Sequence, residues 1–143
     1  MTNKKIFIYS SIFIIIVLIV VTISCRYYKD KSLENNVILI KESLNRAKVN
    51  LESYRSSLDS GKLENVICEL YHCRIMYPTV NKENIIEEVD LTTLMRVISI
   101  MKSNKYDLYG LDDLDKGLNL LEKDIYSLDG FSYLEFFVNK NLH

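Results

Sequence analysis

Two cysteines and a histidine lie close enough in the sequence to raise the question of metal chemistry. Cys68 and His72 are four residues apart, so on a helix they would share one face, as in some zinc sites. Cys73 would point roughly 140° away from Cys68 on the same helix. A structural zinc ion takes four ligands, and the remaining ones would have to be remote carboxylates. We therefore expect ordinary thiols here and no metal.

The sequence also gives little support to catalysis. His72 and His143 are the two histidines, and no serine or cysteine has an evident base with a third group to orient it. Four aspartates lie close together before and within the predicted fourth helix. They lack the ligand order of a calcium-binding EF-hand loop. They suit the first turn of a helix, where the helix dipole favours negative charge. This group comprises Asp107, Asp112, Asp113 and Asp115. We expect a protein that is not an enzyme and has no cofactor.

The third cysteine, Cys25, closes the most informative segment of the chain. Lys4 and Lys5 precede an uncharged stretch over residues 6–24, and residues 12–21 are apolar without interruption. A helix of that length measures about 28 Å, close to the thickness of the hydrocarbon core of a bilayer. The sequence therefore predicts a membrane anchor over residues 1–25.

Two hypotheses treat this anchor as a peptide. In the first, it is an uncleaved transmembrane helix whose flanking side chains lie at the membrane interface, as aromatic and basic residues usually do. These side chains are Arg26, Tyr27, Tyr28 and Lys29. In the second, it is a cleaved signal peptide, but Ile23 is bulky for the position two residues before Cys25.

A third hypothesis is a bacterial lipoprotein. The run Val21-Thr22-Ile23-Ser24-Cys25 resembles a permissive lipobox, with a small residue before the cysteine and uncharged residues upstream. Thr22 departs from the pattern, since leucine is usual there. The resemblance implies that Cys25 is lipidated and becomes the mature N-terminus, with acyl chains replacing the peptide as the anchor.

Two opposing signals bear on the side of the membrane. Arg26, Lys29 and Lys31 after the stretch, against Lys4 and Lys5 before it, slightly favour a cytoplasmic domain. The whole arrangement, however, is typical of an export signal, and long following domains translocate largely regardless of charge. We expect an extracytoplasmic domain, although two unpaired thiols would suit a reducing compartment better.

Charge and length limit the part of the chain after the anchor. The chain has 18 basic and 19 acidic side chains, and Lys4 and Lys5 belong to the anchor, so the remainder has a net charge of −3. This argues against nucleic-acid binding, which requires a basic face. The 118 residues after Cys25 suffice for one small domain. We expect a basic and aromatic linker over residues 26–32 and a helical domain over residues 33–143.

Apolar periodicity predicts a long helical hairpin. Asp59-Ser60-Gly61 indicates a turn, and the second helix should end before Pro78, because a residue that precedes proline is disfavoured in helical dihedrals. The first helix has apolar residues at alternating spacings of four and three, and the second at three and four. The two sets are Leu33, Val37, Ile40, Leu44, Ala47, Leu51, Tyr54 and Leu58, then Leu63, Val66, Leu70, Cys73 and Tyr77.

The rest of the chain predicts further helices. Asn81 is the expected N-cap of the third, with Glu83 nearby, Ile85 and Ile86 inside it, and a change of phase near Asp90. A loop over residues 103–110 precedes a helix over residues 111–128, which Asp129-Gly130 should end. A short helix from Phe131 to Val138 closes the chain. We predict an all-α protein, with an N-terminal transmembrane or signal helix followed by a four- to five-helix bundle.

The layout is similar to that of small, singly anchored helical proteins of unknown function from low-GC Gram-positive bacteria. A short basic start, one apolar span and about 100 helical residues with a turn at Asp59-Ser60-Gly61-Lys62 carry the resemblance. It implies a membrane-tethered accessory role and assigns no functional residues.

Tyrosine is the remaining unusual feature, with ten copies in the chain. Tyrosine is common at protein interfaces. We expect most of these rings to edge the core and Tyr106 and Tyr109 to be candidates for a partner surface. Our first hypothesis is a scaffold or interaction module with an unknown protein partner. The alternative is an envelope lipoprotein, lipidated at Cys25, that binds a ligand or peptide.

Overall fold

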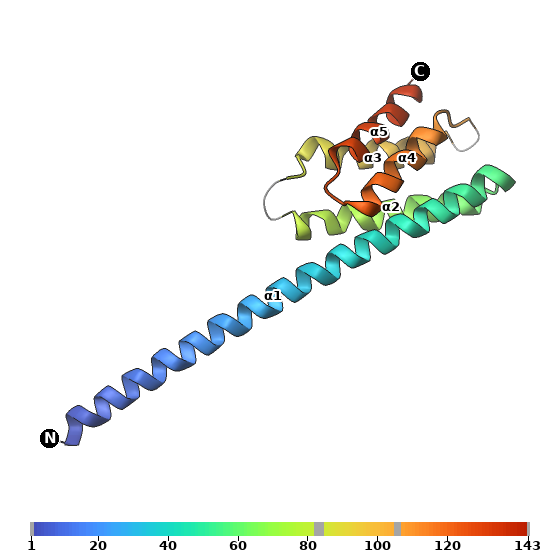
Figure 1. The fold of residues 1–143 in the computed structure, drawn as a ribbon. Helices are drawn as coiled ribbons and strands as arrows, with labels where there is room; N and C mark the ends of the chain where they lie inside the picture. Colours follow the sequence, from blue (N-terminus) through green and yellow to red (C-terminus); the bar gives the residue numbers. More distant parts are fainter. Residues whose placement is uncertain (1, 82–84, 105–106, 143) are drawn as a thin grey trace. The chain divides into compact units, whose positions relative to one another are not determined.

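The computed structural model of the protein describes residues 2–81, 85–104 and 107–142. These residues form five helices and no strand, which confirms the all-α prediction (Figure 1). The helices are α1 (Thr2–Ser57), α2 (Ser60–Val80), α3 (Glu88–Ser103), α4 (Leu111–Lys123) and α5 (Leu128–Lys140). The chain divides into two compact units, Met1–Asn35 and Asn36–His143, and α1 contributes to both.

The first unit contains the predicted anchor. Among the described helices, α1 is the one that is long and apolar enough to cross a membrane. Its side chains from Ile12 to Val21 are all exposed, as lipid-facing residues would be in the absence of a bilayer. Residues 26–32, which we expected to be a linker, are helical within α1.

The second unit has its core on one side of α1. Five consecutive members of the predicted apolar seam are at most 3% exposed, namely Ile40, Leu44, Ala47, Leu51 and Tyr54. Leu58, the last predicted member, lies beyond the helix and is 71% exposed. The middle of the seam is therefore buried under the other helices, whereas its last position is exposed.

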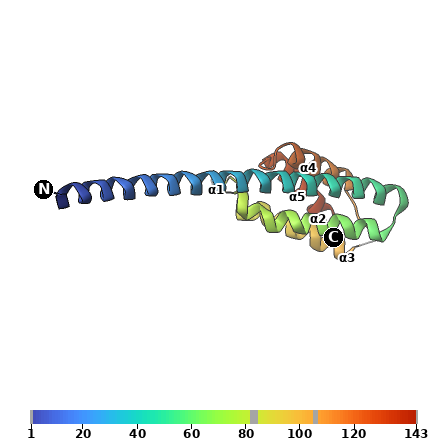
Figure 2. The same ribbon diagram turned by 90° about the horizontal axis from the view of Figure 1, so that it is seen from below.

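A tight connection joins α1 to α2, and the part of α1 after Asn35 runs alongside α2 as a hairpin (Figure 2). Leu58 has a positive φ of 53°, and Asp59 caps α2 by accepting the Gly61 N–H at 2.8 Å. The predicted apolar face of α2 is buried throughout, from Leu63 to Tyr77. Between the helices, the Asn36 amide donates to Thr79 Oγ1 at 3.0 Å.

The expected end of α2 before Pro78 is wrong. The helix continues to Val80 with Pro78 inside it. Proline inside a helix removes one N–H group and crowds the preceding turn, and the contacts of the last turn offset this cost. Here the Asn81 N–H closes the last turn on the Tyr77 carbonyl at 3.0 Å, and Val80 is buried at 2% exposure.

The expected start of the third helix at Asn81 is also wrong. Asn81 ends α2, and its side chain bonds both backbone groups of Ile86, at 2.7 and 3.0 Å. The amide therefore stabilises the connection and does not cap a helix. α3 begins at Glu88, where Asp90 accepts the Glu87 N–H at 3.0 Å. Glu83 lies outside the described residues.

The predicted helix over residues 111–128 is in fact two elements. α4 ends at Lys123, and Ser127 caps α5 by accepting the Gly130 N–H at 3.1 Å. Gly130 does not end a helix. It lies inside α5, where the packing of α5 against α4 requires a small residue. A Cβ atom on Gly130 would lie 2.7 Å from Leu121, and one on Gly117 would lie 3.0 Å from the Gly130 carbonyl. The two glycines thus allow α4 and α5 to approach closely.

One buried hydroxyl in the core has no hydrogen-bond partner within the described part of the chain. Tyr77 is fully buried beside Phe131, and burial raises the pKa of its phenol well above the ordinary value. Tyr126 is the contrasting case, since its hydroxyl donates to the Val80 carbonyl at 3.0 Å. An unpaired buried hydroxyl costs stability, whereas a paired one contributes to it.

We predict that Tyr77→Phe leaves the free energy of unfolding unchanged or raises it by up to about 1 kcal/mol, because it removes an unsatisfied group. Tyr126→Phe should lower the same free energy by about 1 kcal/mol. Urea unfolding of the full chain in detergent, followed by circular dichroism, measures both. A loss in Tyr77→Phe as large as that in Tyr126→Phe would show that the Tyr77 hydroxyl is paired after all.

Candidate functional site

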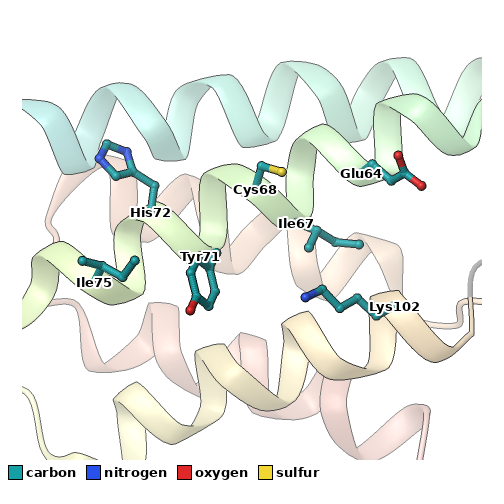
Figure 3. A pocket seen from close by; sticks show the side chains of 7 residues that line it. All are labelled: Glu64, Ile67, Cys68, Tyr71, His72, Ile75 and Lys102. Carbon is teal, nitrogen blue, oxygen red and sulfur yellow. The ribbon is translucent and has the colours of Figure 1, made fainter.

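The clearest hollow on the second unit is an open groove between α2 and α3, with a volume of about 710 Å³ (Figure 3). Six of its seven lining residues come from α2, at helical spacings that keep them on one side. The lining residues are Glu64, Ile67, Cys68, Tyr71, His72, Ile75 and Lys102. We refer to this set as the α2–α3 groove.

The groove exposes apolar side chains that a small soluble domain usually covers. Ile67 is only 5% exposed, whereas Tyr71 and Ile75 are 48% and 57% exposed. Figure 3 shows these three side chains along the α3 side of α2. Their spacing of four residues places them one turn apart over about 12 Å. The groove thus presents a short apolar track.

Lys102 is the contribution of α3 to this groove. Figure 3 shows its side chain reaching from α3 toward the space between Ile67 and Tyr71. It forms no ion pair within the part of the chain that the structure describes. The carboxylate of Glu64 lines the same end of the groove, so a cation and an anion lie beside the apolar side chains there.

On its other side, the groove is connected to α1 by a polar network. His72 Nδ1 lies 2.8 Å from the hydroxyl of Ser43, which is fully buried on α1. Arg46 donates to the same hydroxyl at 3.0 Å and makes a two-point ion pair with Glu69, at 2.7 and 3.1 Å. Sequence reasoning missed this serine, because it lies in the polar flank of the seam.

The serine–histidine contact does not form a nucleophile. Ser43 has no solvent exposure, and its oxygen already accepts from Arg46, so a substrate could not reach it. The network instead satisfies polar groups in the contact between α1 and α2. Partial burial raises the pKa of Glu69, but hydrogen bonds from Arg46 and Ser43 outweigh burial and hold that pKa below its ordinary value.

The two cysteines of α2 have different surroundings. Cys68 is exposed in the groove, whereas Cys73 is buried and its thiol contacts the Ile40 carbonyl at 3.8 Å. Burial raises the pKa of the Cys73 thiol to about 12. In the described residues, no group of three histidine, cysteine, aspartate or glutamate side chains is arranged to hold a metal ion.

Two of the four acidic residues near α4 form ion pairs. Asp112 pairs with Arg55 of α1, and Asp113 pairs with Lys140 of α5 at 2.5 Å. Both carboxylates lie in the first turn of α4. This position suits the dipole of the helix, and the pairs connect α4 to two other helices.

The candidate partner residues near this region are only partly described. Tyr106 lies outside the described residues. The backbone of Tyr109 is held at both its N–H and its carbonyl by the Asn141 side chain, at 2.9 and 2.8 Å, while its ring is 64% exposed. Tyr109 is therefore a fixed aromatic group on the surface, in a polar hollow that is separate from the α2–α3 groove.

The predicted lipidation and interface residues all lie on α1 in the first unit. Cys25 is exposed with a free thiol, and the rings of Tyr27 and Tyr28 are exposed too, with their centroids 6.0 Å apart. Arg26 and Lys29 are exposed beside them. Their proposed roles at a membrane remain predictions.

Comparison of the chain with known protein families, with curated proteins and with solved structures finds no match.

Glu69 gives the contact between α1 and α2 a defined dependence on pH. Because folding lowers the pKa of Glu69, its contribution to stability is present above the pKa of the unfolded chain and disappears as pH falls through the lower folded value. We predict that Glu69→Gln destabilises the protein at about pH 7 and that its deficit relative to the unmodified protein shrinks by about pH 3. Urea unfolding at both pH values measures this. An equal deficit at the two pH values would show that the carboxylate charge is not the cause.

Proposed function

We propose that this protein is a membrane-tethered, non-enzymatic helical module that binds a protein partner at the cell envelope. Its second unit would serve as a scaffold or accessory domain, a bundle of helices built on the α1–α2 hairpin. The observation that carries the proposal is the α2–α3 groove, in which Tyr71 and Ile75 are about half exposed beside Lys102. Exposed apolar side chains gathered in a hollow are typical of binding surfaces.

The groove favours a helix as the bound element. It lies between two helices, and its apolar side chains recur every four residues, which matches the anchors of an amphipathic helix docked in a groove. Lys102 and Glu64 at the Ile67 end offer one cation and one carboxylate to polar residues of such a helix. Binding, and not catalysis, is the better proposal, because among the described residues the Ser43 hydroxyl is buried and the exposed Cys68 thiol makes no hydrogen bond to His72, which bonds Ser43 instead.

The tether is the second part of the proposal. α1 contains a stretch long enough to span a bilayer, and Arg26 to Lys29 would then lie at the membrane interface. We propose a retained span with the second unit outside the cytoplasm. A lipoprotein modified at Cys25 is the alternative for the same tether.

A photo-crosslinking amino acid in place of Tyr71 tests the groove in intact cells that produce the full chain. We expect it to link to a partner helix whose linked peptide has apolar residues at helical spacing. The same amino acid in place of Glu135, which is exposed on α5, is the matched control. Equal products from both positions, or products with lipid alone, would contradict protein binding in the groove.

Cys25→Ala distinguishes the two tethers. A retained span predicts that the variant stays in the membrane fraction after alkaline extraction at the level of the unmodified protein, because the apolar stretch is unchanged. A lipoprotein predicts loss of fatty-acid labelling and release of the protein from the membrane. In the same cells, protease removal of a C-terminal tag without lysis would support an extracytoplasmic domain, and protection until lysis would contradict it.

A further inference from the structure

The second unit carries a second hollowed surface, which shares no residue with the α2–α3 groove. It consists of two adjoining hollows of about 610 and 420 Å³ that both include Lys140, and we call them together the Lys140 surface. Within the described part of the chain, its lining contains no leucine, isoleucine or valine. The larger hollow is lined by Asp113, Tyr133, Phe136, Asn139 and Lys140, and the smaller by Asn104, Asp107, Tyr109, Lys140 and Asn141.

The exposed aromatic rings of this surface are held in place by their neighbours. The Phe136 ring is 53% exposed and packs edge-to-face against Tyr133, with the two ring centroids 5.8 Å apart. Lys116 lies over the Tyr133 ring, with its Nζ atom 5.7 Å from the centroid. The 64% exposed ring of Tyr109 is fixed through its backbone by Asn141. Two rings are thus preorganised for a ligand, one in each hollow.

Polar side chains border these rings, and their charges balance. Lys140 pairs with Asp113 at 2.5 Å, and the exposed amide of Asn139 can both donate and accept hydrogen bonds. The charged lining residues are Asp107, Asp113 and Lys140, and Lys116 adds a second positive charge over the Tyr133 ring. With two charges of each sign, the surface favours an uncharged ligand over an acidic or a basic one.

We propose that the Lys140 surface binds a neutral saccharide whose rings have the stereochemistry of glucose. When all ring substituents are equatorial, both faces of a sugar consist of C–H groups and its edge consists of hydroxyl groups. The C–H groups suit the negative face of an aromatic ring, which Phe136 and Tyr109 offer. The hydroxyl groups both donate and accept, and so match the Asn139 amide and the polar groups of Asp113 and Lys140.

Two adjoining hollows favour an oligosaccharide over a single sugar. Phe136 lines one hollow, Tyr109 lines the other and Lys140 borders both, so successive sugar rings of one chain can use both. A helix of a protein partner is a poorer occupant, because its apolar side chains would meet polar groups here and not an apolar track. The inference goes beyond the proposed function and uses none of the residues that line the α2–α3 groove.

Saturation-transfer NMR with the full chain tests this inference, in a detergent whose head group is not a sugar. The probe is cellohexaose, a linear chain of β-linked glucose. We expect saturation to pass from the protein to the probe and to be strongest at the C–H groups on one face of the sugar rings. Mannohexaose is the matched comparison, since an axial hydroxyl group blocks one face of each of its rings. It should bind more weakly.

Substitution of the exposed ring then locates the site. Phe136→Ala should weaken the binding of cellohexaose about tenfold, because it removes an aromatic contact. Phe136→Tyr keeps the ring and should bind as the unmodified protein does. Leu128→Ala is the matched control, since Leu128 lies on the same helix, is 59% exposed and lines neither hollow. Circular dichroism shows whether each variant keeps its helices.

Absence of saturation transfer to cellohexaose overturns the inference. So does transfer that Phe136→Ala leaves unchanged, or that Leu128→Ala lowers by as much, because the sugar would then contact the protein elsewhere. Neither result bears on the α2–α3 groove. The photo-crosslinker at Tyr71 tests that groove separately, so failure of saccharide binding and failure of the proposed function are distinguishable.

Discussion

The packing of the second unit depends on which neighbour each side of α1 contacts. The apolar seam alternates steps of four and three, so Ile40 to Tyr54 stay on one side and become buried. Because the core fixes that side, the polar residues on either flank face a particular neighbour. One flank reaches α2 through Ser43 and the other reaches α4 through Lys48, which pairs with Glu122 at 2.5 Å. The fourth side is left to solvent or to a partner.

Polar contacts set the register that apolar packing alone leaves loose. A slide by one turn can still bury leucine and valine side chains, whereas a buried hydroxyl that loses its partner costs stability. Ser43 has no exposure, and it meets His72 of α2 only in the observed alignment, in which Arg46 also reaches Glu69. A shift of α2 by one turn would separate Ser43 from His72 and the Glu69 carboxylate from Arg46. The position of the groove relative to the neighbouring part of α1 follows from this network.

Sequence patterns predicted the buried faces well and the helix ends and the groove poorly, for physical reasons. Periodicity reports which side of a helix meets the core, and the faces of α1 and α2 are buried as expected. Ends depend on single side chains with several possible partners, so Asn81 bonds Ile86 instead of capping a helix. The groove is formed by residues of two helices. Tyr71 and Ile75 stay half exposed only because of where α3 lies, and Lys102, about 30 residues away in sequence, joins them through that packing (Figure 3).

A tether lowers the affinity that such a groove needs in order to hold a partner. An open apolar track of two turns would hold a free partner weakly, since ordering both partners offsets much of the energy gained. Partners confined to one membrane layer have already lost part of that freedom, and their effective concentration is high. A shallow groove then suffices, and a deeper one would expose more apolar surface whenever it was empty. In the function that we propose, the anchor therefore compensates for the shallowness of the groove.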